Sequence, residues 1–492
     1  MGSAASPKLL EDNKLAGEEG VGNYGLRDQR RALEWVHDFI ADFGGEGSNV
    51  TLFGASTGAS DILSHLNSTS NASYPLFARA IVQSPIIEPN LPSVSFVGGH
   101  LNKVMSALRV STIQELRKVP VDKLVNFTSG PRAVDDGYLF KNGFTETRTA
   151  EEISQNHLHV PEKLTAQCVI EQHIADTHGT HPSRIGAKVL QILHHDQLAL
   201  VPRPRGPAAS QQPVIIGDCS DESFGYASAA STWTPPAVVR RLGAICQSVK
   251  KANALLRAYD ISAHTPDEEF LERVLELIND ARFAWPTHLA AEKFRSSRTL
   301  KDSGGVWRYV FDQGAPGSGV PHHATDLLYL FDTARSAFAA QLLLATPEPD
   351  MFFPDRFNVD DDDDDDDTPF DNSAFDNSAF DDGGSDDEPM PSVDQYQYSA
   401  VRDALQTRWL AFAYGQAPWS RDKVFVFGPE GEAGERGMNI FESRRRTTSW
   451  RNALEPLGQV LVQKVGLELS NGPSGGPQLM HRQQMLGDHD KL

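Results

Sequence analysis

The chain of 492 residues is poor in cysteine and contains no long apolar run. Its three cysteines, Cys168, Cys219 and Cys246, are too few for a disulfide framework, and their number is odd. No apolar stretch approaches the length of a membrane-spanning helix. The N-terminal stretch MGSAASPKLLEDNKLAGEEG is polar and acidic and lacks the basic-then-apolar order of a signal peptide. The sequence therefore predicts a cytoplasmic protein with no membrane span.

Basic residues are too dispersed to form a stripe that would neutralise the phosphates of a nucleic acid. The net charge is −21, but fifteen Asp or Glu and no Lys or Arg fall between residues 360 and 388. The rest of the chain therefore carries only about −6. The triple Arg444–Arg446 is expected to be a solvated surface run. We expect no nucleic-acid partner.

The histidines do not follow a metal-binding pattern. His173, His178 and His181 cluster loosely, as do His194 and His195. Neither spacing resembles the His-Glu-x-x-His motif of zinc enzymes, and no glycine fingerprint of a phosphate-binding or dinucleotide-binding loop is present. The sequence predicts no metal ion and no cofactor.

One segment, residues 354–391, differs from the rest in composition. It contains eight consecutive aspartates at 360–367, followed by two copies of FDNSA. It is too charged and too simple to bury apolar surface, so we expect a disordered insertion. A solvated loop is the first interpretation, and capture of a basic partner or of cations is the alternative. Residues 470–492 are predicted to form a flexible C-terminal tail.

The remaining sequence alternates short apolar runs with long helical patterns. Strands are expected at residues 50–53, 80–83, 213–216, 306–311 and 424–427, and helices near 101–118, 237–280, 324–343 and 392–414. A further helix before residue 50 should end at Gly44-Gly45. This alternation is typical of a mainly parallel sheet covered by helices. We assign residues 1–353 and 392–469 to one such α/β domain.

Ser56 lies in the G-x-S-x-G pattern of a nucleophile elbow. The pattern is short enough to occur by chance, and a second match surrounds Ser474 in the tail. A nucleophilic serine must sit on a sharp turn between a strand and a helix, with small neighbours. Ser56 has an expected strand before it and a helix-compatible run after it, whereas Ser474 has neither. The context favours Ser56.

A serine nucleophile also needs a base to accept its proton and a carboxylate to orient that base. In hydrolases with this type of sheet, the chain order is serine, acid, histidine. The strand 213–216 is followed by an acidic loop that contains Glu222, and the strand 306–311 by a loop that contains His323. Because catalytic residues follow strands in open α/β sheets, Ser56, Glu222 and His323 fit this order.

The stretch from Val21 to Ala59, VGNYGLRDQRRALEWVHDFIADFGGEGSNVTLFGASTGA, closely resembles the type-B carboxylesterase/lipase family, which includes the cholinesterases. Weaker similarity continues through FARAIVQS at 77–84, VDDG at 134–137, GDCSDE at 217–222, PHHATDL at 321–327 and WLAFA at 409–413. The resemblance implies an α/β-hydrolase fold with helices on both faces of the sheet.

The resemblance also implies roles for individual residues. Ser56 aligns with the nucleophile, Glu222 with the acid and His323 with the base of the family. His322 competes with His323 for the position of the base. Asp218 and Asp221 are rivals of Glu222, although each of these competitors is first interpreted as an ordinary surface-loop residue.

The negative charge created by attack of the serine needs hydrogen-bond donors. One donor would be the backbone N–H of Thr57, and the family supplies others from a His-Gly-Gly loop upstream of the serine. In residues 1–55 the only two adjacent glycines are Gly44 and Gly45, which are the expected end of a helix. We therefore expect an N-terminally truncated α/β-hydrolase fold whose strand 50–53 is an exposed sheet edge, open to self-association.

The expected function is hydrolysis of small carboxylic esters by a serine hydrolase, through an acyl-enzyme intermediate. Two alternatives remain at this point. The chain could be a weak or inactive relative that acts as a binding module, or a truncated gene product without its oxyanion loop. Labelling by a serine-directed probe distinguishes the enzyme from the binding module.

Overall fold

The computed structural model describes residues 4–18, 20–88, 90–125, 133–140, 212–296, 304–333 and 395–473. Six strands in these ranges form one sheet: β1 (Thr51–Ala55), β2 (Arg79–Gln83), β3 (Val214–Cys219), β4 (Val306–Phe311), β5 (Lys423–Phe427) and β6 (Ala433–Gly437). The strand order follows the chain from β1 to β6. The first five strands are parallel and β6 is antiparallel to β5, so the predicted mainly parallel sheet is confirmed.

The sequence did not predict β6. Its sequence AGERG has no β-branched or aromatic residue, so it carries no strand signal. Pairing with β5 along five residues makes it a strand. Tertiary context therefore decides this element.

The described helices before the third strand are α1 (Pro7–Leu15), α2 (Tyr24–Phe39), η1 (Ile40–Phe43), α3 (Thr57–Asn67), α4 (Thr69–Ser73), α5 (Val94–Ala107), α6 (Ile113–Leu116) and α7 (Val121–Val125). Between β3 and β4 lie η4 (Phe224–Tyr226), α11 (Ala227–Ala230), α12 (Pro235–Cys246), α13 (Val249–Ala258), α14 (Asp267–Asn279), η5 (Asp280–Ala284) and α15 (Trp285–Ser296). The remaining helices of the described ranges are α16 (Thr325–Leu330), α18 (Gln395–Ala413), α19 (Met438–Arg444), α20 (Thr447–Ser449), η6 (Trp450–Leu454), α21 (Glu455–Leu457) and α22 (Gln459–Ser470).

Several predicted helices are shorter than expected. The stretch predicted near 237–280 consists of α12, α13 and α14, because Gln247 adopts a positive φ of 51° and Pro266 precedes the start of α14. The stretch near 101–118 divides into α5 and α6 around Arg109, which also has a positive φ. Gly44, with φ 81°, ends η1, which confirms the predicted helix end at this glycine pair.

Side chains of the sheet alternate between two helical layers. On one face, Ala80 and Val82 of β2 pack with residues of β3, β4, α3 and α15. On the other face, Ile81 of β2 packs with Trp307 and Tyr309 of β4 and with the apolar side of α18. Because successive side chains of a strand point to opposite faces, this alternation shows that both faces are covered. The expected helices on both faces are confirmed.

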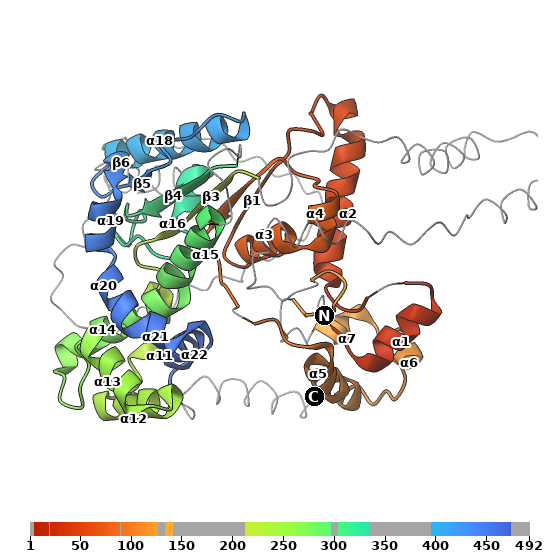
Figure 1. Cartoon of the computed structure of the whole chain (residues 1–492), viewed down its shortest axis with the longest axis horizontal. Coiled ribbons are helices and arrows are strands. Elements are labelled where there is room, and N and C mark those ends of the chain that lie inside the picture. The colour runs from red at the N-terminus through yellow and green to blue at the C-terminus, as the bar shows by residue number, and fades with distance from the viewer. Residues whose placement is uncertain are drawn as a thin grey trace, which may run out of the picture.

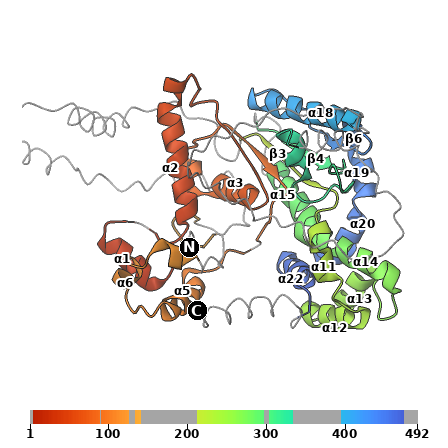
Figure 2. The same ribbon diagram turned by 180° about the vertical axis from the view of Figure 1, so that it is seen from behind.

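Two further apolar clusters lie away from the sheet. Helices α12, α13 and α14 pack with η6 and α22 around Trp285 and Trp450. Helices α1, α5 and α6 form a smaller cluster around Leu101. Figure 1 shows these clusters well apart in the lower part of the view, with α12–α14 in green on the left and α1 and α5 in red to brown on the right, and Figure 2 shows the same arrangement from behind.

Strand β1 forms one edge of the sheet. In the described part of the chain it pairs with β2 alone, and Phe53 at its centre is 47% exposed. The ring of Phe53 contacts that of Phe331, which is also exposed. This confirms the prediction that the strand before Ser56 is an exposed edge.

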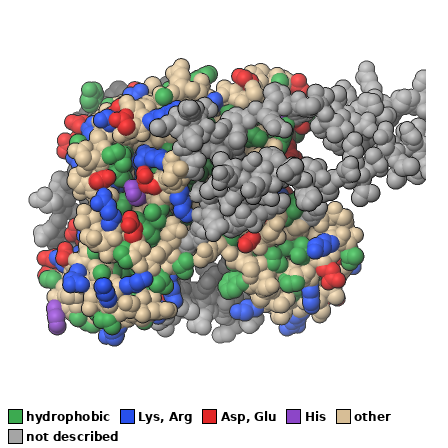
Figure 3. Space-filling model, in the orientation of Figure 1, with side chains coloured by type: hydrophobic (Ala, Val, Ile, Leu, Met, Phe, Trp, Pro, Cys, Tyr) green, Lys and Arg blue, Asp and Glu red, His purple; other side chains and the backbone are tan. Residues whose placement is uncertain are grey.

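The surface in Figure 3 has acidic and basic side chains interspersed over its described part. None of the described helices is long and apolar enough to cross a membrane. The predicted acidic insertion at 354–391 lies outside the described residues, as do Cys168 and most of the predicted tail. Cys219 and Cys246 are buried free thiols.

Candidate active site

Ser56 occupies a strained turn between β1 and α3. Its φ is 56° and its ψ is −120°, a conformation that non-glycine residues rarely adopt. A Cβ on Gly54 would lie 2.9 Å from the carbonyl carbon of Gly58, so glycine is needed where the strand passes the first turn of the helix. Strain of this kind collects at functional sites, and it gives Ser56 the geometry of a nucleophile elbow.

The backbone fixes the turn on two sides. The N–H of Ser56 donates to the carbonyl oxygen of Gln83 at the end of β2, at 2.9 Å, and the N–H of Ser60 donates to the carbonyl of Ser56. Thr57 is the first residue of α3 and is exposed. The first N–H groups of a helix have no partner within the helix and carry partial positive charge. The turn therefore presents donors beside the Ser56 hydroxyl.

Glu222 and His323 form a direct pair in the loops after β3 and β4. The Nδ1–H of His323 donates to Oε2 of Glu222 at 2.5 Å. The other carboxylate oxygen of Glu222 accepts from the backbone N–H of Cys219 at 2.7 Å. The Glu222 carboxylate is fully buried, whereas the imidazole is 30% exposed. The sequence-predicted acid and base are thus brought together across two adjacent strands.

This pairing sets the ring chemistry of His323. Burial lowers the pKa of His323, but the hydrogen bond to Glu222 and the negative charge of Glu222 outweigh burial, and the pKa lies above the ordinary 6.5. Burial in turn raises the pKa of Glu222, and the bond to His323 opposes that rise. With Nδ1 donating to the carboxylate, Nε2 of the neutral ring is left to accept a proton.

The rivals of Glu222 have other partners. Asp218 is fully buried and forms ion pairs with Arg308, at 3.0 Å, and with Arg445. The surface-loop interpretation of Asp218 is therefore wrong: the arginines hold its charge inside the protein. Asp221 is half-buried and accepts from the hydroxyl of Ser223 at 3.0 Å. Neither aspartate is paired with His323.

His322 does not take the place of His323. Its Nδ1 lies 3.0 Å from the backbone carbonyl oxygen of His323, and its ring stacks on Phe224 at 5.8 Å between centroids. The backbone of His322 pairs with that of Asp221 in an isolated parallel β-bridge, which joins the two loops. The one-residue ambiguity of the sequence is resolved in favour of His323 as the partner of Glu222.

The structure also corrects the prediction that Arg444–Arg446 form a solvated surface run. Arg445 is buried in its ion pair with Asp218, and Arg446 pairs with Glu276 and lies over the ring of Tyr259. Only Arg444 of the three is exposed. Composition predicted a solvated run because nothing in the sequence next to these residues reveals a buried carboxylate 227 positions away.

Ser56 is connected to the histidine loop indirectly. Within the described residues, no hydrogen bond joins the Ser56 hydroxyl to His323. Instead, Gln83, whose carbonyl accepts from Ser56, donates through its side-chain amide to Asp326 at 2.8 Å. Tyr309 also donates to Asp326, at 2.9 Å. The structure therefore joins the acid to the base. The serine turn and both loops follow the carboxyl ends of parallel strands, and β1, before the serine, is two strands from β3, before the acid.

Sequence reasoning missed several residues that support the site. Gln83 is fully buried and links the serine turn to the helix after His323. Asn279 accepts from the backbone N–H of Glu222 at 2.9 Å, and the ring of Phe283 lies 5.1 Å from that of His323. The sequence stretch 77–84 contained Gln83, but only the tertiary structure reveals what these side chains contact.

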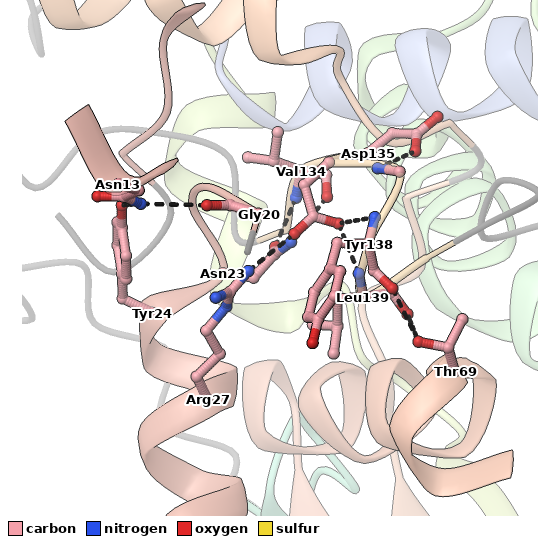
Figure 4. Close-up of polar contacts among 12 residues, drawn as sticks. Asn13, Gly20, Asn23, Tyr24, Arg27, Thr69, Val134, Asp135, Tyr138 and Leu139 are labelled. Carbon is pink, nitrogen blue, oxygen red and sulfur yellow. Dashed lines mark hydrogen bonds and ion pairs between the residues drawn. The ribbon is translucent and has the colours of Figure 1, made fainter. Parts of the chain in front are cut away.

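The VDDG stretch at 134–137 lies in a loop that Figure 4 shows pinned to α2 and α4. The side chain of Asn23 exchanges two hydrogen bonds with the backbone of Val134, and Arg27 pairs with Asp136 at 3.1 Å. Thr69 donates to the carbonyl of Tyr138 at 2.8 Å. A cavity of about 480 Å³ beside this loop is lined by Leu10, Lys14, Gly17, Glu18, Gly20, Asp136 and Tyr138. None of the predicted site residues lines this cavity.

The described ranges contain no group of three or more His, Cys, Asp or Glu side chains that could hold a metal ion. The loose histidine clusters at 173–181 and 194–195 lie outside those ranges. The described site itself offers a strained serine, an imidazole whose Nδ1 is paired, and a buried carboxylate.

Comparison with known proteins gives a consistent picture. The model of the family described as "Carboxylesterase family" matches residues 14–354. The chain is 38% identical over 117 residues to carboxylesterase patB of Penicillium expansum, which is 24% of this chain and 21% of that protein. It is 26% identical over 336 residues to lipase 4 of Diutina rugosa, which is 63% of this chain and 52% of the lipase. The chain thus spans about half the length of this lipase and less of patB.

Solved structures agree on the fold. A carboxylesterase of Geobacillus stearothermophilus superposes with a TM-score of 0.52 at 18% identity, covering 87% of this chain and 69% of that one. A PNB esterase superposes with a TM-score of 0.50 at 16% identity, covering 87% and 68%. At this level of identity, the likeness supports the α/β-hydrolase fold.

Proposed function

Because the chain belongs to the carboxylesterase family, we propose that it is a serine hydrolase that cleaves small carboxylic esters through an acyl-enzyme. One observation carries this proposal: the hydrogen bond between His323 and Glu222. Their loops, like the strained turn of Ser56, follow the carboxyl ends of parallel strands. A histidine that donates through Nδ1 to a buried carboxylate has the tautomer that a general base requires.

In the first half of the reaction, the Ser56 hydroxyl attacks the ester carbonyl carbon. Nε2 of His323 takes the hydroxyl proton, and Glu222 stabilises the imidazolium that forms. The carbonyl π electrons move to the oxygen, which becomes an oxyanion. When the tetrahedral intermediate collapses, His323 gives its proton to the leaving alcohol and the acyl group stays on Ser56.

In the second half, water takes the place of the alcohol. His323 accepts a proton from the water, whose oxygen attacks the acyl carbon. The second intermediate collapses, the bond to Ser56 breaks, and the proton on His323 returns to the serine oxygen. The carboxylic acid leaves and the starting state is restored.

The backbone N–H of Thr57 is the proposed oxyanion donor. It lies at the N-terminus of α3, where the N–H groups have no partner within the helix, and it follows the nucleophile directly. One such donor contributes about 3–4 kcal/mol to the stabilisation of the transition state in comparable hydrolases.

A fluorophosphonate probe and a short-chain nitrophenyl ester test the function. We expect the parent chain to be labelled by the probe and to hydrolyse the ester. Ser56→Ala should be neither labelled nor active. Ser474→Ala, at the second match to the motif, is the control and should behave as the parent. A folded parent that is neither labelled nor active would favour the binding-module alternative, and hydrolysis by Ser56→Ala at the parent rate would exclude Ser56 as the nucleophile.

Self-association through β1 is a second part of the proposal. The open hydrogen-bonding edge of β1 and the exposed ring of Phe53 support it. Phe53→Lys should shift the chain from a dimer towards a monomer in size-exclusion chromatography with light scattering. Phe96→Lys, at a still more exposed phenylalanine on α5, should leave the mass unchanged. A parent that is monomeric at all concentrations would contradict this part.

A further inference from the structure

A π-helical segment and the residue directly before it contact the two members of the acid–base pair. The segment η5 (Asp280–Ala284) joins α14 to α15. Asn279, the residue before it, accepts the backbone N–H of Glu222 at 2.9 Å. Phe283, within it, places its ring 5.1 Å from the His323 ring at an interplanar angle of 47°. Two residues four positions apart, one at the end of α14 and one in η5, thus contact the acid and the base respectively.

The segment is anchored independently of the site. The hydroxyl of Tyr259 donates to Asp280 at 2.8 Å. The guanidinium of Arg282 lies over the ring of Tyr226 at 4.7 Å and donates to the hydroxyl of Ser470 at 2.6 Å. Phe283 itself is fully buried. Because its neighbours fix the segment, it can act as a rigid support for the loops that reach it. Single π-helical turns are rare and appear frequently at functional sites.

We propose that Asn279 and Phe283 are positioning residues of the acid–base pair. Asn279 holds the loop that carries Glu222, and Phe283 sets the plane of the His323 ring and excludes water from one of its faces. The catalytic meaning of this inference rests on the proposed function, whereas the contacts themselves do not.

The expected effect of Phe283 on the pKa of His323 follows from burial and from the charged groups that face the imidazole. Glu222 and Asp326 raise the pKa of His323, and Arg282 lowers it, while burial also lowers it. Replacing Phe283 by leucine leaves these charged groups in place but admits water to the imidazole. The pKa of His323 should therefore rise further. Since the neutral ring is the base, the acidic limb of the pH profile of kcat/KM should move to higher pH.

The kinetic test compares Phe283→Leu with Phe270→Leu. Phe270 is buried in α14, in the helical cluster away from the site, so its substitution costs similar packing without touching His323. For Phe283→Leu we expect kcat to fall about tenfold and KM to change by less than about twofold, because a misplaced base slows the reaction rather than binding. Phe283→Tyr, which keeps the ring, should recover kcat. Phe270→Leu should keep the parent kcat and the parent pH profile.

A second variant covers the case in which Phe283→Leu does not fold. Asn279→Leu removes the side-chain amide, and with it the hydrogen-bond acceptor, and keeps the same number and branching of side-chain heavy atoms. We expect a similar fall in kcat at constant KM. Retention of the parent kcat and pH profile in both Phe283→Leu and Asn279→Leu, with both folded as fully as Phe270→Leu, would overturn the inference.

An NMR titration separates this inference from the proposed function. The ring signal of His323, assigned with His323→Gln, gives its pKa without any substrate. A higher pKa in Phe283→Leu than in the parent and in Phe270→Leu supports the positioning role even in a chain that hydrolyses no ester. An unchanged pKa contradicts it. Failure of the parent to hydrolyse esters would instead count against the proposed function alone.

Discussion

The serine turn after β1 and the acid–base loops after β3 and β4 are held by different kinds of contact. Ser56 follows the edge strand β1 and is fixed by local backbone geometry, by a glycine that lets α3 approach, and by one hydrogen bond to Gln83 at the end of β2. Glu222 and His323 are fixed by side chains from several distant elements and lie over the middle of the sheet. The difference teaches that local sequence can build a nucleophile turn, whereas an acid–base pair requires the assembled tertiary structure.

The largest expected effect comes from a substitution that disrupts the acid–base pair and leaves the serine turn intact. In Glu222→Gln the carboxylate that selects the Nδ1–H tautomer of His323 is lost, so kcat for ester hydrolysis should fall by about 10⁴-fold. Asp221→Asn, at the half-buried neighbour, should stay close to the parent. Steady-state kinetics on a nitrophenyl ester measures both. A loss of less than tenfold in Glu222→Gln would show that the pair does not orient the base.

The next effect concerns the stability of the same part of the site. Asp218→Asn removes the buried negative charge that pairs with both Arg308 and Arg445. The substitution should lower the free energy of unfolding by about 3–5 kcal/mol. Glu269→Gln, which removes an exposed pair with Arg273, should cost at most about 1 kcal/mol. Urea unfolding of both variants checks the contrast, and equal losses would contradict it.

A smaller effect tests the serine turn. In Gly54→Ala the new methyl group would meet the backbone of Gly58, and we expect a loss of about 1–3 kcal/mol in unfolding free energy together with a lower kcat. Gly243→Ala has open space around the new methyl group in α12, so it should stabilise the protein by about 1 kcal/mol. Should Gly54→Ala match the parent in stability and kcat, the close approach of strand and helix would have no role in the turn.

The smallest effect is a displacement along the pH axis. The pKa of folded His323 lies above the ordinary 6.5, because Glu222 stabilises the imidazolium against the opposing effect of burial. Only the neutral ring can accept the serine proton, so kcat/KM should rise with pH through a pKa above 6.5. By the same linkage, the His323 contribution to stability is fully present below pH 6.5 and is lost as pH rises through the folded pKa. An acidic limb at or below pH 6.5 would contradict the pairing.

The sequence predicted five strands, because each has a clear apolar signal. The edge position of the first strand was predicted from the family resemblance, because the family places further strands before it. The sequence also ranked Glu222 and His323 first among their neighbours, through the resemblance that the pairing now supports. It failed for Asp218 and Arg445, which it placed on the surface, because an ion pair between residues far apart in the chain leaves no local signal. The long helix expected near 237–280 failed for a related reason: apolar spacing continues across breaks at which the backbone turns.

The amino-acid sequence by itself determined the alternation of strands and helices, the family, and the serine turn, since these depend on side-chain spacing and on glycines within a few positions. The tertiary structure decided which of two histidines meets which of three carboxylates, that β6 becomes a strand, and that a π-helical segment supports the pair. These features depend on contacts between residues from about 40 to about 100 positions apart, or on pairing with a neighbouring strand, and folding alone sets them.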